Sequence, residues 1–243
     1  MIHVSIAKDD LFVYYLSESG VNNVRGNSMQ LETEQTVSQQ PDTSAAPSAG
    51  LLFVLSAPSG TGKDSVIKAL KEQGMDFYVV PSVTTRLPRP GESEGNPYLF
   101  VSEEKFKQLV DEGELLEYAN VHGNWYGQPR KLIRDNLLAG RDVLLKIDVQ
   151  GAATIRRKVP QAIFIFLVPS SLEELTQRLV TRQTETEEER LRRLADAREE
   201  LTQQYWYDYV VVNRQGHLQE AVDQLRAIML AEHARTHPRH IDI

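Results

Sequence analysis

A glycine-rich turn with a single lysine occupies residues 56–64, where the sequence is SAPSGTGKD. An apolar run at residues 51–55 precedes the turn, and helical spacing at residues 63–74 follows it. Between a strand and a helix, such a turn can direct backbone N–H groups and the positive end of the helix dipole toward phosphate oxygens. The spacing predicts a nucleotide phosphate site in which Lys63 reaches the β- and γ-phosphates. The expected lining of this site is Ala57, Pro58, Ser59, Gly60, Thr61, Gly62, Lys63 and Asp64.

Two positions depart from the usual phosphate-loop pattern, G-x-x-x-x-G-K-[ST]. Ala57 stands at the first glycine, where a methyl group is tolerated unless the backbone needs a positive φ. Asp64 stands where a hydroxyl normally contacts Mg²⁺, and a carboxylate can also bind Mg²⁺ directly or through water. Asp64 is therefore a candidate Mg²⁺ ligand, although the loop taken alone is equally compatible with a plain glycine-rich turn.

A basic and aromatic segment follows at residues 81–98, PSVTTRLPRPGESEGNPY. Arg86 and Arg89 flank a proline-stiffened loop, and Tyr98 closes the segment. A guanidinium group presents a rigid fork of donors that suits phosphate, so two arginines and a phenol can hold one monophosphate. The competing interpretation is a solvated basic loop.

Two carboxylates could bind a base. Glu117 lies in a strand-like run, and Asp148 ends the apolar run DVLLKID. Ligands of open parallel sheets bind at the carboxyl ends of the strands. Carboxylates accept hydrogen bonds from N1–H and the exocyclic amine of guanine, whereas adenine lacks this pair of donors. A helix N-cap role is the alternative for Asp148, and core packing is the alternative for Trp125.

Strand-like and helical segments alternate from residue 51 onward, which predicts an α/β fold with a mostly parallel sheet and helices on both faces. The predicted strands include residues 51–57, 77–85, 98–101, 142–148, 162–168 and 207–213. A helix capped by Ser102 is expected to stop at Gly113, and two short strands are expected around a turn at residues 123–124. The last helix is expected to end near His233.

Composition limits the class of protein. The 243 residues are 41% hydrophobic, which is enough for one sizeable core with a small satellite domain. A net charge of -7 argues against general nucleic-acid binding, whose footprint is normally basic. The absence of cysteine excludes disulfides and thiolate chemistry, and no apolar run approaches the roughly 18 residues of a membrane span. We expect no nucleic-acid or membrane partner and a cytoplasmic location.

The ends of the chain differ from its middle. Residues 30–50 are polar and lack periodicity, so residues 1–49 are predicted to be a disordered extension and linker. A translation start at Met29 is a further hypothesis. The apolar patch LFVYYL at residues 11–16 could instead dock on the domain as a short strand or helix. Residues 236–243 are expected to form a C-terminal tail.

From residue 51 to about 233 the sequence resembles the guanylate kinases. The family pattern G-P-S-G-x-G-K is met by APSGTGK, S-x-T-T-R-x-P-R by SVTTRLPR and G-x-x-Y by GNPY. The segments EGELLEYA, GNWYG and IDVQG match further family motifs, as do SLEELTQRL, TRQTETEEE and YDYVVVN. So many ordered matches make the resemblance specific. It places a kinase-like domain at residues 50–235.

The resemblance implies an ATP:GMP phosphotransferase that uses Mg²⁺ and has a three-part P-loop kinase fold. That fold has an α/β core, a small mixed-β GMP-binding region at about residues 83–130 and a helical lid at about residues 178–205. The roles implied are catalysis by Lys63 and arginines, binding of the GMP phosphate and recognition of guanine. The catalytic arginines would be Arg86, Arg89, Arg178, Arg182 and Arg193; the GMP-binding residues would be Ser82, Arg86, Arg89, Tyr98, Glu117, Trp125, Gln128 and Asp148. A monomer and a homodimer both remain open.

Several residues depart from the family pattern. Trp125 replaces a tyrosine that contacts the GMP phosphate, and Gln128 replaces a serine or threonine, although its amide could still donate to guanine O6. Lys146 stands where many relatives carry an acid, and it occurs together with an aspartate like Asp64 in plant organelle guanylate kinases. A working enzyme is favoured over two rivals, which are a catalytically inactive scaffold and a kinase for another small acceptor.

Overall fold

The computed structural model describes residues 50–243 except 90, 96, 122 and 181–186. The predictions of a disordered segment at residues 1–49 and of a translation start at Met29 fall outside these residues. The same holds for the predicted lid residue Arg182.

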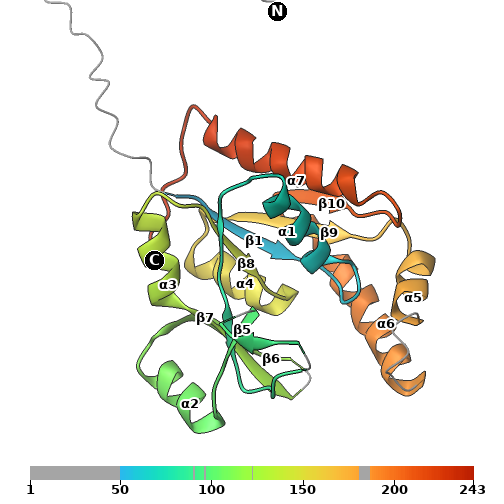
Figure 1. Ribbon diagram of the computed structural model, residues 1–243, viewed down its shortest axis with the longest axis horizontal. Helices are drawn as coiled ribbons and strands as arrows, with labels where there is room; N and C mark the ends of the chain where they lie inside the picture. The colour runs from blue at the N-terminus through green and yellow to red at the C-terminus, as the bar shows by residue number, and fades with distance from the viewer. Residues whose placement is uncertain (1–49, 90, 96, 122, 181–186) are drawn as a thin grey trace, which may run out of the picture. The chain divides into compact units, whose positions relative to one another are not determined.

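A five-stranded parallel sheet forms the centre of the domain, as the alternation of strands and helices predicts (Figure 1). Its strands lie in the order β10-β9-β1-β8-β2, and each neighbouring pair is parallel. Every residue of β1 and β9 is buried, because helices cover both faces. The strands are β1 (Leu52–Ser56), β2 (Tyr78–Val79), β8 (Val143–Lys146), β9 (Ile163–Val168) and β10 (Tyr209–Val212).

Alternation along β1 divides the core into two layers, because successive side chains point to opposite faces of a strand. Phe53 and Leu55 pack with α1 (Lys63–Glu72) and α7 (Leu218–His233). Leu52 and Val54 pack with the helices on the other face, α3 (Arg130–Leu138) and α4 (Val149–Lys158). The chain therefore has the three-layer α/β core that was predicted.

A second, mixed sheet lies within residues 82–129. Its order is β4-β5-β3-β7-β6, with α2 packed on it through Phe106. The prediction of one strand at residues 77–85 is wrong, because β2 belongs to the parallel sheet and β3 to the second sheet. Pro81 lies between them, and proline cannot continue a hydrogen-bonded ladder. The elements are β3 (Ser82–Thr84), β4 (Ser93–Glu94), β5 (Pro97–Phe100), α2 (Glu103–Asp111), β6 (Leu115–Val121) and β7 (Asn124–Pro129).

Two charged helices follow β9. These are α5 (Leu172–Val180) and α6 (Glu187–Thr202), which pack together through Leu175, Leu194 and Ala197 (Figure 1, orange). A short 3₁₀ turn, η1 (Gln203–Trp206), ends α6 and leads into β10. Among the described helices, none has the length and apolar character that a membrane span requires.

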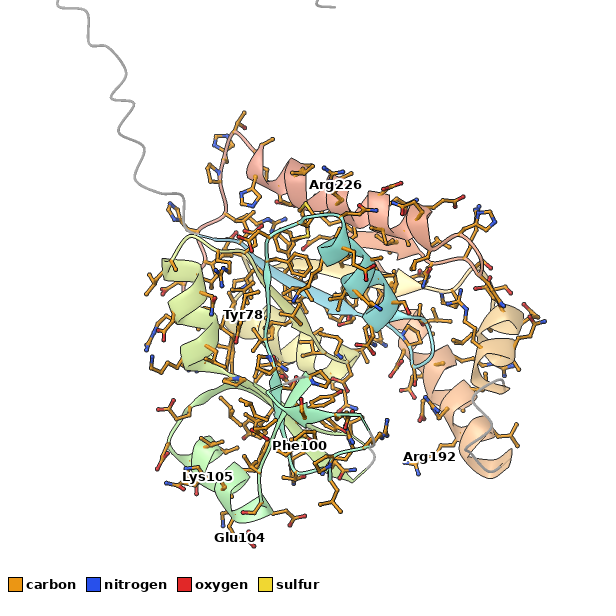
Figure 2. All side chains as sticks on the ribbon, viewed as in Figure 1. Tyr78, Phe100, Glu104, Lys105, Arg192 and Arg226 are labelled. Carbon is orange, nitrogen blue, oxygen red and sulfur yellow. The ribbon has the colours of Figure 1, made fainter. Side chains whose placement is uncertain are left out.

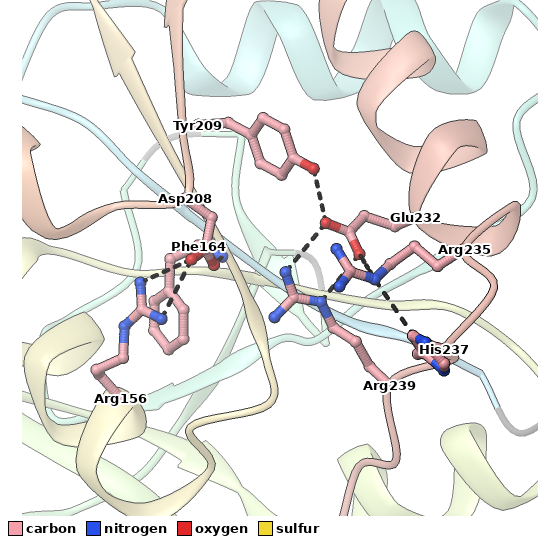
Figure 3. Close-up of polar contacts among 8 residues, drawn as sticks. All are labelled: Arg156, Phe164, Asp208, Tyr209, Glu232, Arg235, His237 and Arg239. Carbon is pink, nitrogen blue, oxygen red and sulfur yellow. Dashed lines mark hydrogen bonds and ion pairs between the residues drawn. The ribbon is translucent and has the colours of Figure 1, made fainter. Parts of the chain in front are cut away.

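The C-terminal residues fold back onto the domain. The carboxylate of Glu232 is buried and accepts hydrogen bonds from Tyr209 Oη at 2.7 Å and from Arg239 Nε at 2.9 Å (Figure 3). Ile241 and Ile243 pack against the core layer that contains α3 and α4. The predicted tail at residues 236–243 is thus docked, because a buried carboxylate requires charged and hydrogen-bonded partners.

Candidate active site at the carboxyl ends of the parallel strands

The glycine-rich turn lies between the end of β1 and the start of α1, as predicted. Gly60 and Gly62 adopt φ values of 87° and 96°, which side-chain-bearing residues rarely adopt. A Cβ atom on Gly62 would lie 2.7 Å from Asn213 Nδ2. The positive φ therefore requires glycine at both positions, and close packing against Asn213 leaves no room for a side chain at position 62.

Contacts from three other elements hold the phosphate loop in place. The carbonyl of Thr61 accepts from Asn213 Nδ2 at 2.7 Å and from Arg178 Nη1 at 2.9 Å. Thr61 Oγ1 itself donates to the carbonyl of Pro58 at 2.8 Å. Arg193 of α6 contacts the hydroxyl of Ser59. Arg178 and Arg193, which the sequence suggested as lid residues, are thus brought to the loop.

Asn213 is a site residue that the sequence analysis missed. It directly follows β10, so it lies at the carboxyl edge of the parallel sheet, and it is buried. The same rule of strand ends that singled out Asp148 applies to this position. The signal was therefore present in YDYVVVN, but a lone amide at a strand end does not reveal that it holds a loop.

Lys63 begins α1 and turns its ammonium group back to the loop, where Nζ donates to the carbonyl of Ala57 at 2.6 Å. Desolvation lowers the pKa of Lys63, the Glu200 carboxylate opposes this shift, and Lys146 adds to it. Burial raises the pKa of Glu200, which α6 contributes to the same region. Sequence analysis missed Glu200, because nothing in a highly charged helix distinguishes it from its neighbour Glu199.

A cavity of about 280 Å³ joins the phosphate loop to the second sheet. One wall carries Lys63, Asp64 and Lys146, and the opposite wall carries side chains from β3, β5, β6 and β7. The predicted residues in its lining are Ala57, Ser59, Lys63, Asp64, Ser82, Tyr98, Glu117, Gln128 and Asp148; Ala119, Val121, Tyr126, Lys146, Ile147 and Glu200 complete it. The structure therefore brings predicted residues from two parts of the sequence to one cavity. Ala57 and Glu117, for example, are 60 positions apart in the sequence.

Arg86 is held beside the cavity by an anion and two aromatic rings. Its Nη2 lies 2.9 Å from both carboxylate oxygens of Glu92. Its guanidinium carbon lies 5.1 Å from the ring centroid of Tyr98 and 5.9 Å from that of Phe100, which Figure 2 labels on the second sheet. Arg89 is exposed, and its backbone N–H donates to Glu92 at 2.8 Å. The rigid Arg86 and the exposed Arg89 thus share one carboxylate.

The far end of the cavity holds buried polar groups from adjacent strands. Gln128 Nε2 donates to Ser82 Oγ at 2.7 Å, while Gln128 Oε1 is buried and meets no donor among the described residues. Glu117 pairs with Gln128 across β6 and β7. Burial raises the pKa of Glu117 to about 8, and the nearby Asp148 adds to this effect. These acceptors are matched to a ligand that donates hydrogen bonds.

Asp148 adopts the helix N-cap role that was the alternative to base recognition, and it still lies in the lining of the cavity. Its Oδ1 accepts from the backbone N–H of Gly151 at 2.9 Å and caps α4. The residue also lines the cavity with Glu117. The N-cap fixes the orientation of the carboxylate, which favours its use in recognition.

Trp125 lies outside the lining of this cavity. It is 37% exposed, and its ring packs at 5.9 Å from Phe106 and 6.1 Å from Tyr118. The next residue, Tyr126, lines the cavity instead, with its ring 5.9 Å from that of Tyr98. Consecutive residues of a strand face opposite sides, so the aromatic pair in GNWYG supplies one ring to the cavity and one to the outer face.

Asp64 is exposed at the first turn of α1, and its Oδ1 lies 2.6 Å from Lys146 Nζ. The described residues contain no cluster of three acidic or histidine side chains that could hold a metal ion by itself. Mg²⁺ commonly takes only one or two carboxylates and completes its shell with water and substrate phosphates. A single carboxylate beside a phosphate loop fits that mode of binding.

Comparisons with known proteins agree with this geometry. The family model for guanylate kinase matches residues 50–232. The chain is 46% identical over 200 residues to guanylate kinase 2, chloroplastic/mitochondrial, of Oryza sativa subsp. japonica, covering 82% of this chain and 70% of that protein. It is 46% identical over 186 residues to the guanylate kinase of Caldanaerobacter subterraneus subsp. tengcongensis, covering 76% and 89%. The crystal structure of guanylate kinase from Anaplasma phagocytophilum superimposes with a TM-score of 0.65 at 37% identity, covering 78% and 89%.

Proposed function

Because the chain belongs to the guanylate kinase family, we propose that it transfers the γ-phosphoryl group of ATP to GMP and releases ADP and GDP. One observation carries this proposal: a single cavity is lined both by Lys63 of the phosphate loop and by the buried acceptors of the second sheet. The cavity can therefore hold a donor phosphate and an acceptor base together. Enzymes catalyse phosphoryl transfer mainly by positioning the two substrates and by neutralising the charge of the transferring phosphate.

On the donor side, backbone N–H groups of residues 59–62 would bind the phosphates of ATP, and Lys63 would neutralise the transferring group. Mg²⁺ bound with ATP would offset further phosphate charge. Asp64 would hold this ion directly or through water. Arg178 and Arg193 would join from the lid side, since both already contact the loop. Arg182 is proposed for the same role on the family motif alone.

On the acceptor side, Arg86, Arg89 and Tyr98 would bind the phosphate of GMP. Glu117 and Asp148 would accept from N1–H and the exocyclic amine of guanine, and Ser82 and Gln128 would contact the same edge of the base. The Gln128 amide donates to Ser82, which leaves Oε1 as its free acceptor. Family membership also suggested Trp125 in this group, and its packing on Phe106 supports an indirect role only.

The role of Asp64 can be separated from that of a solvent-facing helix residue. Asp64→Asn keeps the size of the side chain and removes its charge, so it should raise the Mg²⁺ concentration needed for half-maximal rate. Asp64→Ser restores the common loop pattern and should retain activity. An unshifted Mg²⁺ titration curve for Asp64→Asn would exclude the metal role.

A panel of acceptors tests the proposed function. We expect rapid phosphorylation of GMP, slower reaction of dGMP and poor reaction of AMP, UMP and CMP in a coupled ADP-release assay. A site built for specific hydrogen bonds rejects analogues that lack the donors, by factors of about 10⁴ in favourable cases. Comparable rates with AMP and GMP would overturn the assignment, and no reaction with any acceptor would favour the scaffold alternative.

The division of the chain is part of the proposal. Residues 50–235 would form the catalytic domain, with the GMP-binding region at about 83–130 and the lid at about 178–205. Deleting residues 1–45 should leave the melting temperature and the GMP kinase rate nearly unchanged. A cytoplasmic location is proposed too, because a cysteine-free chain needs no oxidising compartment. Cell fractionation tests it, with an organelle as the competing result.

A further inference from the structure

Lys146 and Asp64 form a close ion pair in the lining of the cavity. Lys146 ends β8 beside Leu55 of β1, and Asp64 lies in the first turn of α1. Lys146 Nζ and Asp64 Oδ1 are 2.6 Å apart. The two partners differ in burial, since the Lys146 side chain is 14% exposed and the Asp64 side chain is 83% exposed. Asp64 can therefore swing into solvent, whereas Lys146 is held in the wall of the cavity.

Lys146 also faces the residues proposed to bind the acceptor phosphate. Its Nζ lies 5.6 Å from the ring centroid of Tyr98, and the same ring has the Arg86 guanidinium carbon at 5.1 Å. Tyr98 thus has two cations near its ring. Lys146, Tyr98 and Lys63 line one cavity, so Lys146 can reach a ligand bound between the phosphate loop and the second sheet.

Electrostatics explains why a carboxylate accompanies this lysine. Several cations that line one small cavity repel one another unless an anion lies among them. Glu117, Asp148 and Glu200 also line the cavity, and Asp64 is the carboxylate that pairs directly with Lys146, from the solvent side. An ion pair with one largely exposed partner contributes little to stability, so a phosphate dianion can displace the carboxylate.

Resting on the proposed function, we infer that Lys146 is a binding residue for the acceptor phosphate and that Asp64 positions it until the nucleotide enters. On binding, the ammonium group of Lys146 donates to phosphate oxygens and the Asp64 carboxylate is released. No covalent bond changes in this exchange. Lys146 would then be the third cation at the acceptor phosphate, with Arg86 and Arg89.

Binding measured without ATP or Mg²⁺ tests this inference, by calorimetric titration of GMP and of guanosine, which lacks the phosphate. The readout is the ratio of the two Kd values. Lys146→Met should raise the Kd for GMP by about 10- to 100-fold, because a hydrogen bond between charged groups is lost, and should leave the Kd for guanosine unchanged. Lys146→Arg should restore most of the ratio. Asp64→Asn should lower the Kd for GMP by a few fold, because the competing carboxylate is gone.

A matched control uses another lysine of the same region. Lys68 pairs with Glu72 on the exposed side of α1, with the nearest charged atoms 3.8 Å apart. Lys68→Met should leave the ratio unchanged, and melting temperatures of all variants report on folding. An unchanged ratio in Lys146→Met would overturn the inference and would mean that the ion pair only joins α1 to β8.

The two claims fail in different ways. If the wild-type chain binds AMP more tightly than GMP, the proposed function fails, and Lys146→Met should still abolish the preference for AMP over adenosine. If the wild-type chain binds GMP and Lys146→Met keeps the preference for GMP over guanosine, the role of Lys146 fails alone. Absence of any preference for a monophosphate over its nucleoside in the wild-type chain would overturn both.

Discussion

The two halves of the cavity are built from different chemical groups. The donor half, which the phosphate loop forms and where ATP would bind, presents backbone atoms, and side chains such as Asn213 and Arg178 hold that backbone. The acceptor half, whose wall the second sheet forms and where GMP would bind, presents side chains directly, with Glu117 and Gln128 buried on adjacent strands. One half depends on the path of the chain, and the other depends on the identity of its residues.

This difference explains which departures from the family pattern matter. Ala57 is buried in the core layer of α1 and α7, and its carbonyl oxygen is the group that Lys63 contacts. A methyl group at that position leaves the backbone contacts of the loop in place. Gln128 instead changes the hydrogen-bonding groups of the acceptor half, since its amide brings a buried oxygen with no donor among the described residues. Apart from Lys63 and the two glycines with positive φ, Gly60 and Gly62, substitutions should therefore be tolerated more readily in the loop than in the acceptor wall.

The largest effect is expected at Lys63. Lys63→Ala should lower kcat by about 10²- to 10³-fold, because it removes a preorganised charge from the transferring phosphate. The Kd for GMP should change little, since the loop belongs to the donor half. Single-turnover rates together with GMP titrations would measure both quantities. A near-normal kcat in this variant would mean that the loop does not bind the reacting phosphate.

Arg86 should show the reverse pattern. Arg86→Ala should raise the Kd for GMP by about 10- to 100-fold and leave the Kd for ADP unchanged, because a charge-assisted phosphate contact is lost from the acceptor half alone. Glu92→Gln is the matched control, since it keeps Arg86 and removes the carboxylate that lies 2.9 Å from it. Equal losses of GMP and ADP binding in Arg86→Ala would show that the halves are not separate.

The pKa of Glu117 predicts a pH dependence that only the acceptor half should have. Burial raises this pKa to about 8, so Glu117 is protonated at neutral pH before the base binds. Accepting from guanine N–H groups favours the ionised form, so binding should release about one proton near pH 7 and strengthen up to tenfold per pH unit below the pKa. Calorimetry of guanosine in buffers with different ionisation enthalpies measures the release without interference from a phosphate.

Glu117→Gln is the control for that release and should abolish it. The free energy of unfolding of this variant, measured against pH, also tests whether the pKa of Glu117 is raised. Because the folded-state pKa of Glu117 lies above its usual 4.5, the stabilisation is present below that value and is lost as pH rises through about 8. The wild-type chain should lose stability relative to Glu117→Gln as pH rises from about 4.5 to about 8, and the difference should level off above that pH. Parallel stability curves for the two proteins would mean that Glu117 titrates normally.

How much the sequence could predict also differs between the halves. The parallel sheet and the loop follow from local patterns, namely the apolar runs of β1 and β9 and the spacing that ends at Lys63. The second sheet was harder, because residues 77–85 look like one strand and the chain changes sheets at Pro81. Alternation indicates that Trp125 and Tyr126 face opposite sides of the strand. Which of the two faces the cavity depends on how β7 pairs with β3 and β6.

Contacts between distant segments could not be predicted from local patterns. Asn213 meets Thr61 across 152 positions, and Lys146 meets Asp64 across 82. Both pairs exist because parallel strands bring their carboxyl ends to the same edge of the sheet. The rule identifies the edge where such residues gather, while the partner of each residue depends on side-chain packing in the folded chain.

The smallest effect is expected at Asn213, which touches the loop backbone and not the proposed substrates. Asn213→Ala removes one of two donors to the Thr61 carbonyl and leaves Arg178 as the other. A single hydrogen bond contributes about 0.5–1.5 kcal/mol, so the Kd for ADP should rise about 2- to 10-fold while the Kd for GMP stays constant. Asn213→Asp should be more damaging, because it turns a carboxylate oxygen toward the Thr61 carbonyl. If Asn213→Ala weakens GMP binding as much as ADP binding, the loop also shapes the acceptor half, and the division between a backbone-built and a side-chain-built half is wrong.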